Sequence, residues 1–139
     1  MKLNKQIEFM DNNPDYSLCI TGFIELFEDG KYVPTDNFNY WLCPKGELST
    51  QNLLNGNIVG SSSSRLFRNY DNIFKDYFYK FPYSDWAINF ELSLIGKVQY
   101  LDFPSYVYRL HENSLSRKKC PVDSTNILLE RLNNYNSQQ

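Results

Sequence analysis

The sequence has few of the features that identify a metalloprotein, a membrane protein or a disulfide-bonded protein. It contains one histidine and only three cysteines, which are Cys19, Cys43 and Cys120. The cysteines are far apart and odd in number, so they predict neither a CxxC pair nor a disulfide framework, and no Cys/His cluster suits structural zinc. No apolar run approaches the roughly 18 residues of a membrane-spanning helix, and the N-terminus lacks the apolar stretch of a signal peptide. These absences predict an intracellular protein without a transmembrane segment.

An excess of positive charge is also missing. The chain has 14 Lys and Arg against 16 Asp and Glu, which gives a net charge of −2 and a pI of about 5.4. A mildly acidic chain lacks the electrostatic footprint of a general nucleic-acid binder, so no nucleic-acid partner is expected. A short basic cluster at Arg117, Lys118 and Lys119 is interpreted as a solvated loop rather than a docking patch.

Glycine is scarce, with six residues in the chain, and no glycine-rich turn joins a strand to a helix. The sequence therefore contains neither a P-loop nor a dinucleotide-binding fingerprint, whose backbone N–H groups would cradle phosphates. A nucleotide would have to be bound without the usual first βαβ unit.

Aromatic residues, by contrast, are abundant. The 139 residues are 42% hydrophobic and 17% aromatic, with 11 Tyr and 10 Phe. This length predicts a single domain over residues 1–139, in which residues 117–139 form a C-terminal loop and helix. Tyrosine has an apolar body and a polar tip, so the excess suits either an aromatic core or a surface that stacks on sugar rings. Composition alone favours the core.

The N-terminal third of the chain predicts a helix followed by a hairpin. Leu3, Ile7 and Met10 recur at helical spacing and predict a short amphipathic helix that Pro14 ends. Residues 16–27 are rich in β-branched and aromatic side chains and predict a long, largely buried strand.

The pattern after this strand predicts a turn, a loop and a helix. Asp29-Gly30 predicts a tight turn, after which residues 31–33 pair back as a hairpin. Residues 34–46 are polar and irregular and predict a long loop, and residues 48–55 predict a short helix.

The middle of the chain predicts an extended segment and two helices. Residues 58–68 contain four consecutive serines and are expected to be extended at the edge of the core, and residues 71–82 predict a short helix and a turn. A longer helix is predicted to have Ser84 or Asp85 as its N-cap and to end at Gly96.

The last part of the chain predicts strand, break, strand and helix. Residues 97–102 predict a short strand, Phe103-Pro104 is expected to break it, and residues 106–109 resume an extended course. A final helix is predicted over residues 121–135, with three apolar residues facing inward: Ile127, Leu128 and Leu132. The order of elements predicts an α/β fold in the broad sense of mixed α and β structure.

Asp85 at the start of the longer helix is the first candidate for chemistry. The helix dipole and backbone donors favour the charged form of a carboxylate at this place. A charged carboxylate fixed in a cleft can accept a proton from a hydroxyl, which is general-base catalysis. The alternative is that Asp85 only caps the helix and Trp86 only packs in the core.

Arg109 and His111 form a second candidate, because they share one face of an extended segment. A forked cation together with a second donor or metal ligand suits a diphosphate. The alternative is an edge strand with solvated polar residues. The serine run at residues 61–64, with Arg65 and Arg68 after it, could bind a polar ligand, but no His–acid pair nearby would activate a serine, so it is interpreted as structural.

Taken together, these segments resemble the C-terminal half of family-2 glycosyltransferases, which are inverting sugar transferases of the GT-A fold. The strongest piece is residues 78–86, Phe-Tyr-Lys-Phe-Pro-Tyr-Ser-Asp-Trp, and the resemblance extends over nearly the whole chain up to about Ser116. The order and spacing of the pieces are specific. The other matching segments are residues 2–10, 13–16, 53–57, 64–68, 96–102 and 108–111.

The resemblance implies that Asp85 is the catalytic base. It would take the proton from an acceptor-sugar hydroxyl as that oxygen attacks the anomeric carbon, while nucleoside diphosphate leaves from the opposite side. Trp86 and Tyr83 would line the acceptor pocket. His111, with Arg109 as the weaker candidate, would approach the diphosphate or its metal.

The chain also departs from this family. The N-terminal half of the family carries the nucleotide-binding βαβ units and an Asp-x-Asp motif for Mn²⁺ or Mg²⁺, and nothing in residues 11–13 or 71–72 has that spacing. A diphosphate leaving group needs its developing charge neutralised. We therefore expect a truncated GT-A domain that holds no metal tightly and does not transfer sugar by itself.

Partners follow from the same resemblance. A nucleotide-sugar donor and a saccharide acceptor would be the partners of the complete enzyme, in the cytoplasm or at the membrane periphery. A sheet edge left uncovered by missing strands would favour a homo-oligomer. Two other hypotheses stay open: a non-catalytic module that binds a glycan or a protein through its aromatic surface, and a structural domain without a ligand.

Overall fold

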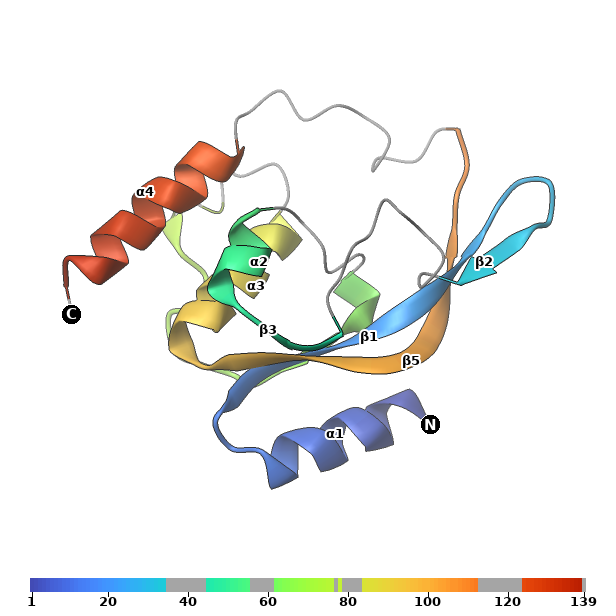
Figure 1. Cartoon of the computed structure of the whole chain (residues 1–139), viewed down its shortest axis with the longest axis horizontal. Coiled ribbons are helices and arrows are strands. Elements are labelled where there is room, and N and C mark those ends of the chain that lie inside the picture. The colour runs from blue at the N-terminus through green and yellow to red at the C-terminus, as the bar shows by residue number, and fades with distance from the viewer. Residues whose placement is uncertain (35–44, 56–61, 77, 79–83, 113–123, 139) are drawn as a thin grey trace.

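Two long parallel strands form the centre of the fold. β1 (Tyr16–Leu26) and β5 (Lys97–Arg109) pair in parallel, from Tyr16 opposite Lys97 to Leu26 opposite Arg109. Figure 1 shows them side by side in a computed structural model. The structure describes residues 1–34, 45–55, 62–76, 78, 84–112 and 124–138.

Three short strands complete a curled, mixed sheet in the described part of the chain. β2 (Tyr32–Pro34) and β4 (Arg65–Phe67) pair antiparallel with different stretches of β1, and β3 (Gly46–Leu48) pairs antiparallel with β5. The predicted hairpin is confirmed, with Gly30 in the left-handed conformation at φ 82° that its turn requires. The sequence analysis does not predict β3, because it places Gly46 in a loop and Leu48 in a helix. The core of the predicted loop, residues 35–44, lies outside the described residues.

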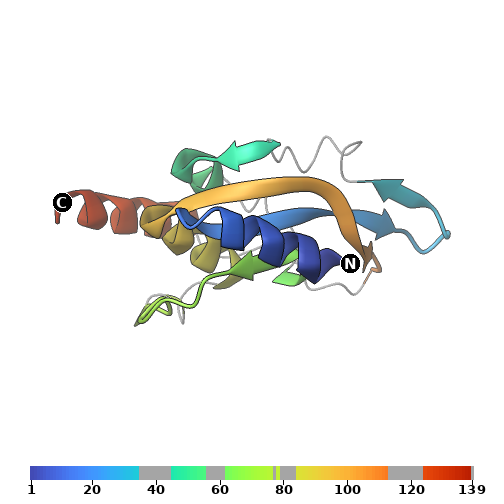
Figure 2. The same ribbon diagram turned by 90° about the horizontal axis from the view of Figure 1, so that it is seen from below.

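β1 has the character of a strand covered on both faces. All residues from Ser17 to Phe23 are buried, which confirms the predicted long, buried strand. A parallel pair is normally covered by helices on both sides. Here α1 (Lys2–Asn12) lies against one face, as Figure 2 shows, and α3 (Ser84–Ile95) packs on the other.

β5 contradicts the predicted break at Phe103-Pro104, because the strand continues to Arg109. Its pairing with β1 steps from Thr21 opposite Leu101 to Gly22 opposite Pro104. This register shift places extra residues on β5, and a proline, which has no N–H to donate, is tolerated at such a bulge. The strand curves strongly toward its carboxyl end (Figure 1).

α1 is confirmed as a helix that ends just before Pro14, but only Met10 of its predicted apolar face is buried. Leu3 and Ile7 are 54% and 48% exposed, whereas Gln6 and Met10 are buried. Gln6 is tolerated there because its Nε2 donates a hydrogen bond of 3.0 Å to the Ser64 carbonyl, a partner that helical periodicity alone cannot reveal.

The segments on either side of β4 are only partly as predicted. Residues 62–64 form a short 3-10 helix, and the extended course begins at Arg65, while residues 58–61 lie outside the described part. Residues 71–75 form turns and bends where a helix was expected, and Ile73 holds them to the core with 2% exposure.

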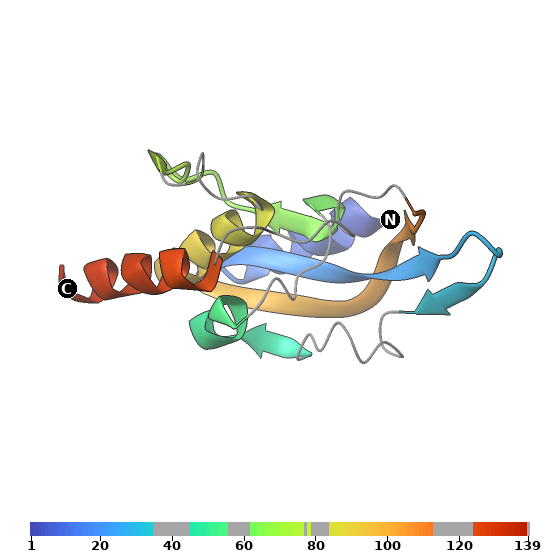
Figure 3. The ribbon, with the colours of Figure 1, turned by 90° about the horizontal axis from the view of Figure 1, so that it is seen from above.

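Three helices gather at one end of the sheet, opposite the β2 hairpin (Figure 3). α2 (Thr50–Leu54) has Ser49 as its N-cap in a capping box with Asn52, so it begins later than predicted. α3 and α4 (Ser124–Asn136) are confirmed as helices. The second core between these helices comprises Leu54, Phe78, Trp86, Ala87, Phe90 and Leu128, with Ile127 and Leu132 packed against it.

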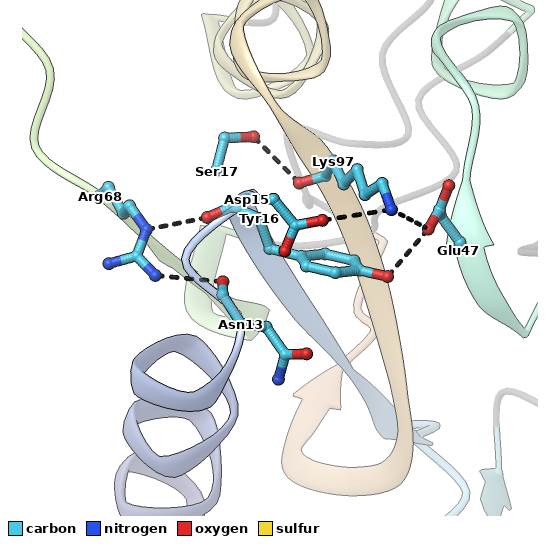
Figure 4. Close-up of polar contacts among 7 residues, drawn as sticks. All are labelled: Asn13, Asp15, Tyr16, Ser17, Glu47, Arg68 and Lys97. Carbon is cyan, nitrogen blue, oxygen red and sulfur yellow. Dashed lines mark hydrogen bonds and ion pairs between the residues drawn. The ribbon is translucent and has the colours of Figure 1, made fainter.

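Arg68 joins three elements at the start of β1. Its Nε donates to the Tyr16 carbonyl at 2.9 Å, and its Nη2 donates to the carbonyls of Asn13, at 3.2 Å, and of Met10. Figure 4 shows the bonds to Tyr16 and Asn13. The guanidinium thus caps the carboxyl end of α1 and holds it against the chain that follows β4.

Replacement of Arg68 by lysine is expected to lower the free energy of unfolding by about 2–4 kcal/mol, because an ammonium group cannot reproduce this forked set of charged hydrogen bonds. Urea denaturation followed by circular dichroism measures the change. The matched substitution Arg109→Lys, at an exposed residue, should stay within about 0.5 kcal/mol. Equal stability of both variants would contradict the role of Arg68.

Replacement of Gly96 by alanine is expected to cost about 1–3 kcal/mol, since the new Cβ would lie 3.0 Å from the Asp15 carbonyl oxygen and 3.0 Å from the Ser17 Cβ. Thermal unfolding measures the loss. Glu130→Ala, on the exposed face of α4, is the control, and a Gly96→Ala variant as stable as this control would show that the α3–β5 turn adjusts freely.

Candidate functional site

Asp85 lies in the first turn of α3 and is half-buried. The helix begins at Ser84, so Asp85 is inside the helix rather than its N-cap. Its Oδ1 accepts a hydrogen bond of 3.0 Å from the N–H of Trp86, and Oδ2 accepts none from the described residues. One carboxylate oxygen is therefore fixed by the helix terminus, and the other remains available as a proton acceptor.

Arg65 connects this turn to the sheet. It is opposite Ile20 in the β4–β1 pair, and its Nη1 donates to the Asp85 carbonyl at 2.8 Å and to Asn89 Oδ1 at 3.1 Å. Asp85 and Asn89 are one helical turn apart and so share a face of α3. The structure thus brings a carboxylate, a guanidinium and an amide together from two elements.

Burial dominates the electrostatics of Arg65. Partial burial lowers the pKa of the guanidinium, and the nearby Asp85 carboxylate and Tyr106 phenol act in the opposite direction. An arginine stays protonated despite such a shift, so the charge persists in a partly dehydrated place.

Trp86 is buried in the core. Its side chain is 8% exposed, packs in the core between the helices and donates its Nε1–H to the Leu53 carbonyl. Stacking on a sugar would require the indole to leave this position. The geometry is that of the core residue considered as the alternative in the sequence analysis.

The remaining predicted site residues are not joined to Asp85 by the structure. Arg109, at the end of β5, and His111, just beyond it, are both exposed. Asp85 forms no hydrogen bond or ion pair with either of them. Tyr83 and residues 117–119 lie outside the described part of the chain.

A second polar cluster lies at the other end of α3. The Tyr16 hydroxyl donates to Glu47 at 2.8 Å, and Lys97 Nζ lies 3.2 Å from Asp15 and 3.7 Å from Glu47 (Figure 4). The hydrogen bond to Glu47 raises the pKa of Tyr16, and the one to Asp15 raises the pKa of Lys97. Asp15, Glu47 and Lys97 border an open groove of about 450 Å³, and the single cation, Lys97, pairs with both carboxylates.

Among the described residues, no group of three or more His, Cys, Asp or Glu side chains is arranged to hold a metal ion. No helix within the described ranges combines the length and hydropathy needed to cross a bilayer.

From the sequence, Arg65 is predicted only as part of the serine-rich segment, and Asn89 is not among the predicted site residues. The spacing of four residues between Asp85 and Asn89 was a usable signal, because it predicts a shared helix face. Nothing local could place Arg65 beside them, since its contact with Asp85 depends on how β4 pairs with β1.

No family model, curated protein or solved structure matches this chain. The candidate site is therefore defined by the contacts of its own residues. Asp85, Arg65 and Asn89 are the residues whose polar groups converge.

Cys19 is buried at 0% exposure, and burial raises the pKa of its thiol to about 11. We expect native protein at pH 8 to leave Cys19 unlabelled by iodoacetamide, because only about one thiol in a thousand would be ionised. Since the folded pKa is raised, the stability gained from the neutral thiol is present below about pH 9 and is lost as the pH rises toward 11.

Peptide mapping by mass spectrometry measures the labelling of Cys19 with and without denaturant, and the Cys19→Ala variant identifies its peptide. Rapid labelling of Cys19 in the folded chain would contradict the predicted protection.

Proposed function

We propose that this chain forms the acceptor-binding part of an inverting glycosyltransferase of the GT-A type. The observation that carries the proposal is the half-buried carboxylate of Asp85 in the first turn of α3, with one oxygen held by a backbone N–H and the other free to accept a proton. The resemblance of the segments to family-2 enzymes supports the same assignment.

In the proposed reaction, a hydroxyl of the acceptor sugar attacks the anomeric carbon of the donor. The new C–O bond forms as the bond to the diphosphate breaks, and the hydroxyl proton passes to Asp85. A carboxylate with one fixed oxygen suits this step, because its orientation is set before the acceptor arrives. Its position in the first turn of α3 places it beside the positive end of the helix dipole.

Some residues around Asp85 hold its helix turn in place, and others are proposed to contact the substrates. Trp86 anchors the helix from the core, and Arg65 holds the Asp85 carbonyl, so the turn is stiffened from both sides. Tyr83, two residues before Asp85, is proposed to line the acceptor pocket. His111, with Arg109, is proposed to meet the diphosphate of the donor.

Metal chemistry is not assigned to the described residues, because none of their carboxylates gather into a possible ion site. The donor, a nucleotide-sugar, and the Mn²⁺ or Mg²⁺ ion would be held by a nucleotide-binding half. The proposal expects the isolated chain to show no transfer, a location in the cytoplasm or at the membrane periphery, and self-association through an uncovered sheet edge.

Replacement of Asp85 by asparagine, in a polypeptide that joins this segment to a nucleotide-binding half, is expected to lower kcat about 10²- to 10⁴-fold. The acceptor dissociation constant should change less than about twofold, because the amide keeps the size and most hydrogen bonds of the carboxylate. Release of nucleoside diphosphate measures the rate.

The control is Asp102→Asn, which removes an exposed carboxylate paired with Lys45 and should leave the rate unchanged. In the isolated chain, amide NMR signals of residues 84–89 should shift when simple methyl glycosides are added. Retained transfer in the Asp85→Asn enzyme would refute the role of Asp85. Shifts with the glycosides but no transfer by the unsubstituted polypeptide would favour the non-catalytic glycan-binding module.

A further inference from the structure

The guanidinium group of Arg65 forms hydrogen bonds through Nη1 but not through Nε or Nη2 in the described part of the chain. Both of its hydrogen bonds come from Nη1, to the Asp85 carbonyl at 2.8 Å and to Asn89 Oδ1 at 3.1 Å, and Nε and Nη2 donate to no described residue. In Arg68, three residues later, it is Nε and Nη2 that donate hydrogen bonds, and they donate to backbone carbonyls.

The unused edge of Arg65 has a defined chemistry. The N–H bonds of Nε and Nη2 lie in one plane and point in parallel, which matches the two oxygens of a carboxylate or a phosphate. Because Nη1 is already held in place, little conformational freedom remains to be lost when such a group binds.

The charge of Arg65 is not matched by a contacting carboxylate. Asp85 meets the guanidinium through its backbone carbonyl, and the ion pairs among the described residues involve other cations: Lys45, Lys97 and Arg131. A half-buried cation has lost part of its hydration, and an anion in contact offsets that loss.

Asn89 provides a second, independent sign of an incomplete site. The residue is 1% exposed, and while Oδ1 accepts from Arg65, Nδ2 has no hydrogen-bond acceptor among the described residues. A buried amide donor without a partner costs free energy, and an oxygen entering beside Arg65 would offset part of that cost. The unused donors of Arg65 and Asn89 thus belong to two residues in contact with each other, and Arg65 also holds the Asp85 carbonyl.

We propose that Arg65 forms an anion-binding subsite next to Asp85, and that the acceptor sugar carries a carboxylate or phosphate close to its reacting hydroxyl. This inference rests on the proposed function and names the acceptor as an acidic saccharide. The Asp85 carboxylate repels a second anion, so the acidic group must lie on the Nε–Nη2 side of Arg65 while the neutral hydroxyl faces Asp85.

The test titrates the full chain with three probes: methyl glucuronide, glucose 6-phosphate and neutral methyl glucoside. NMR follows the backbone amides of residues 84–89 and the Arg65 Nε–H signal. At least one acidic sugar should bind about tenfold or more tighter than the glucoside and shift that Nε–H signal, which reports the contact directly. The comparison of the two acidic sugars identifies the anion.

A substitution of Arg65 distinguishes the effect of its paired Nε–H and Nη2–H donors from the effect of its positive charge. Arg65→Lys keeps the positive charge but removes the parallel N–H pair, so the preference for the acidic sugar should fall about tenfold while binding of the glucoside is unchanged. Arg131→Lys, which alters the ion pair with Glu91, is the matched control and should keep the preference. Thermal unfolding of each variant shows whether it is folded.

Equal binding of acidic and neutral sugars, or a preference that survives Arg65→Lys, would overturn the subsite while leaving the role of Asp85 intact. If uridine diphosphate shifts the Arg65 Nε–H signal but neither acidic sugar does, Arg65 binds the donor rather than the acceptor. That result would also overturn the proposed acceptor subsite. Failure of all three sugars to bind would count against both the subsite and the proposed function.

Discussion

The parallel pairing of β1 with β5 is the constraint on which the rest of the described structure depends. Parallel strands need a long crossover between them and cover on both faces, and here α1 supplies one face and α3 the other. Because α3 runs into β5 through Gly96, with the Lys97 N–H bonded to the Asp15 carbonyl, the pairing also fixes where α3 lies. The position of Asp85 over the sheet follows from that chain of contacts.

The polar cluster at the start of β1 differs from the polar cluster around Asp85 in how fully its groups are paired. At the start of β1, Lys97 pairs with both Asp15 and Glu47, and Arg68 donates to backbone carbonyls. These groups stabilise the joints between elements and have little left for a ligand. Around Asp85, by contrast, a fixed carboxylate, a half-used guanidinium and an amide with an unpartnered donor lie together. A buried donor without a partner requires an explanation, and a ligand bound at this cluster would provide one for Asn89.

Much of the secondary structure could be predicted because it is encoded by near neighbours. The β-branched run beginning at Tyr16 is a strand, Asp29-Gly30 is a turn, and a helix runs to Ile95, although it already includes its predicted N-cap residues. Each of these depends on side-chain periodicity, on backbone conformations open to glycine, or on a residue that favours a helix start. The candidate base was reached in the same way, since a carboxylate at a helix start is visible within a few residues.

Other features were decided only by partners distant in the chain. β5 passes through Pro104 because a register shift against β1 accommodates it, and Gln6 replaces Leu3 and Ile7 on the buried face because the Ser64 carbonyl is there to accept its hydrogen bond. Arg65 reaches Asp85 only through the pairing of β4 with β1. The sequence alone determined the local conformations, since these depend on residues a few positions apart. The tertiary structure decided which polar groups found partners, because that depends on the register and packing of segments far apart in the chain.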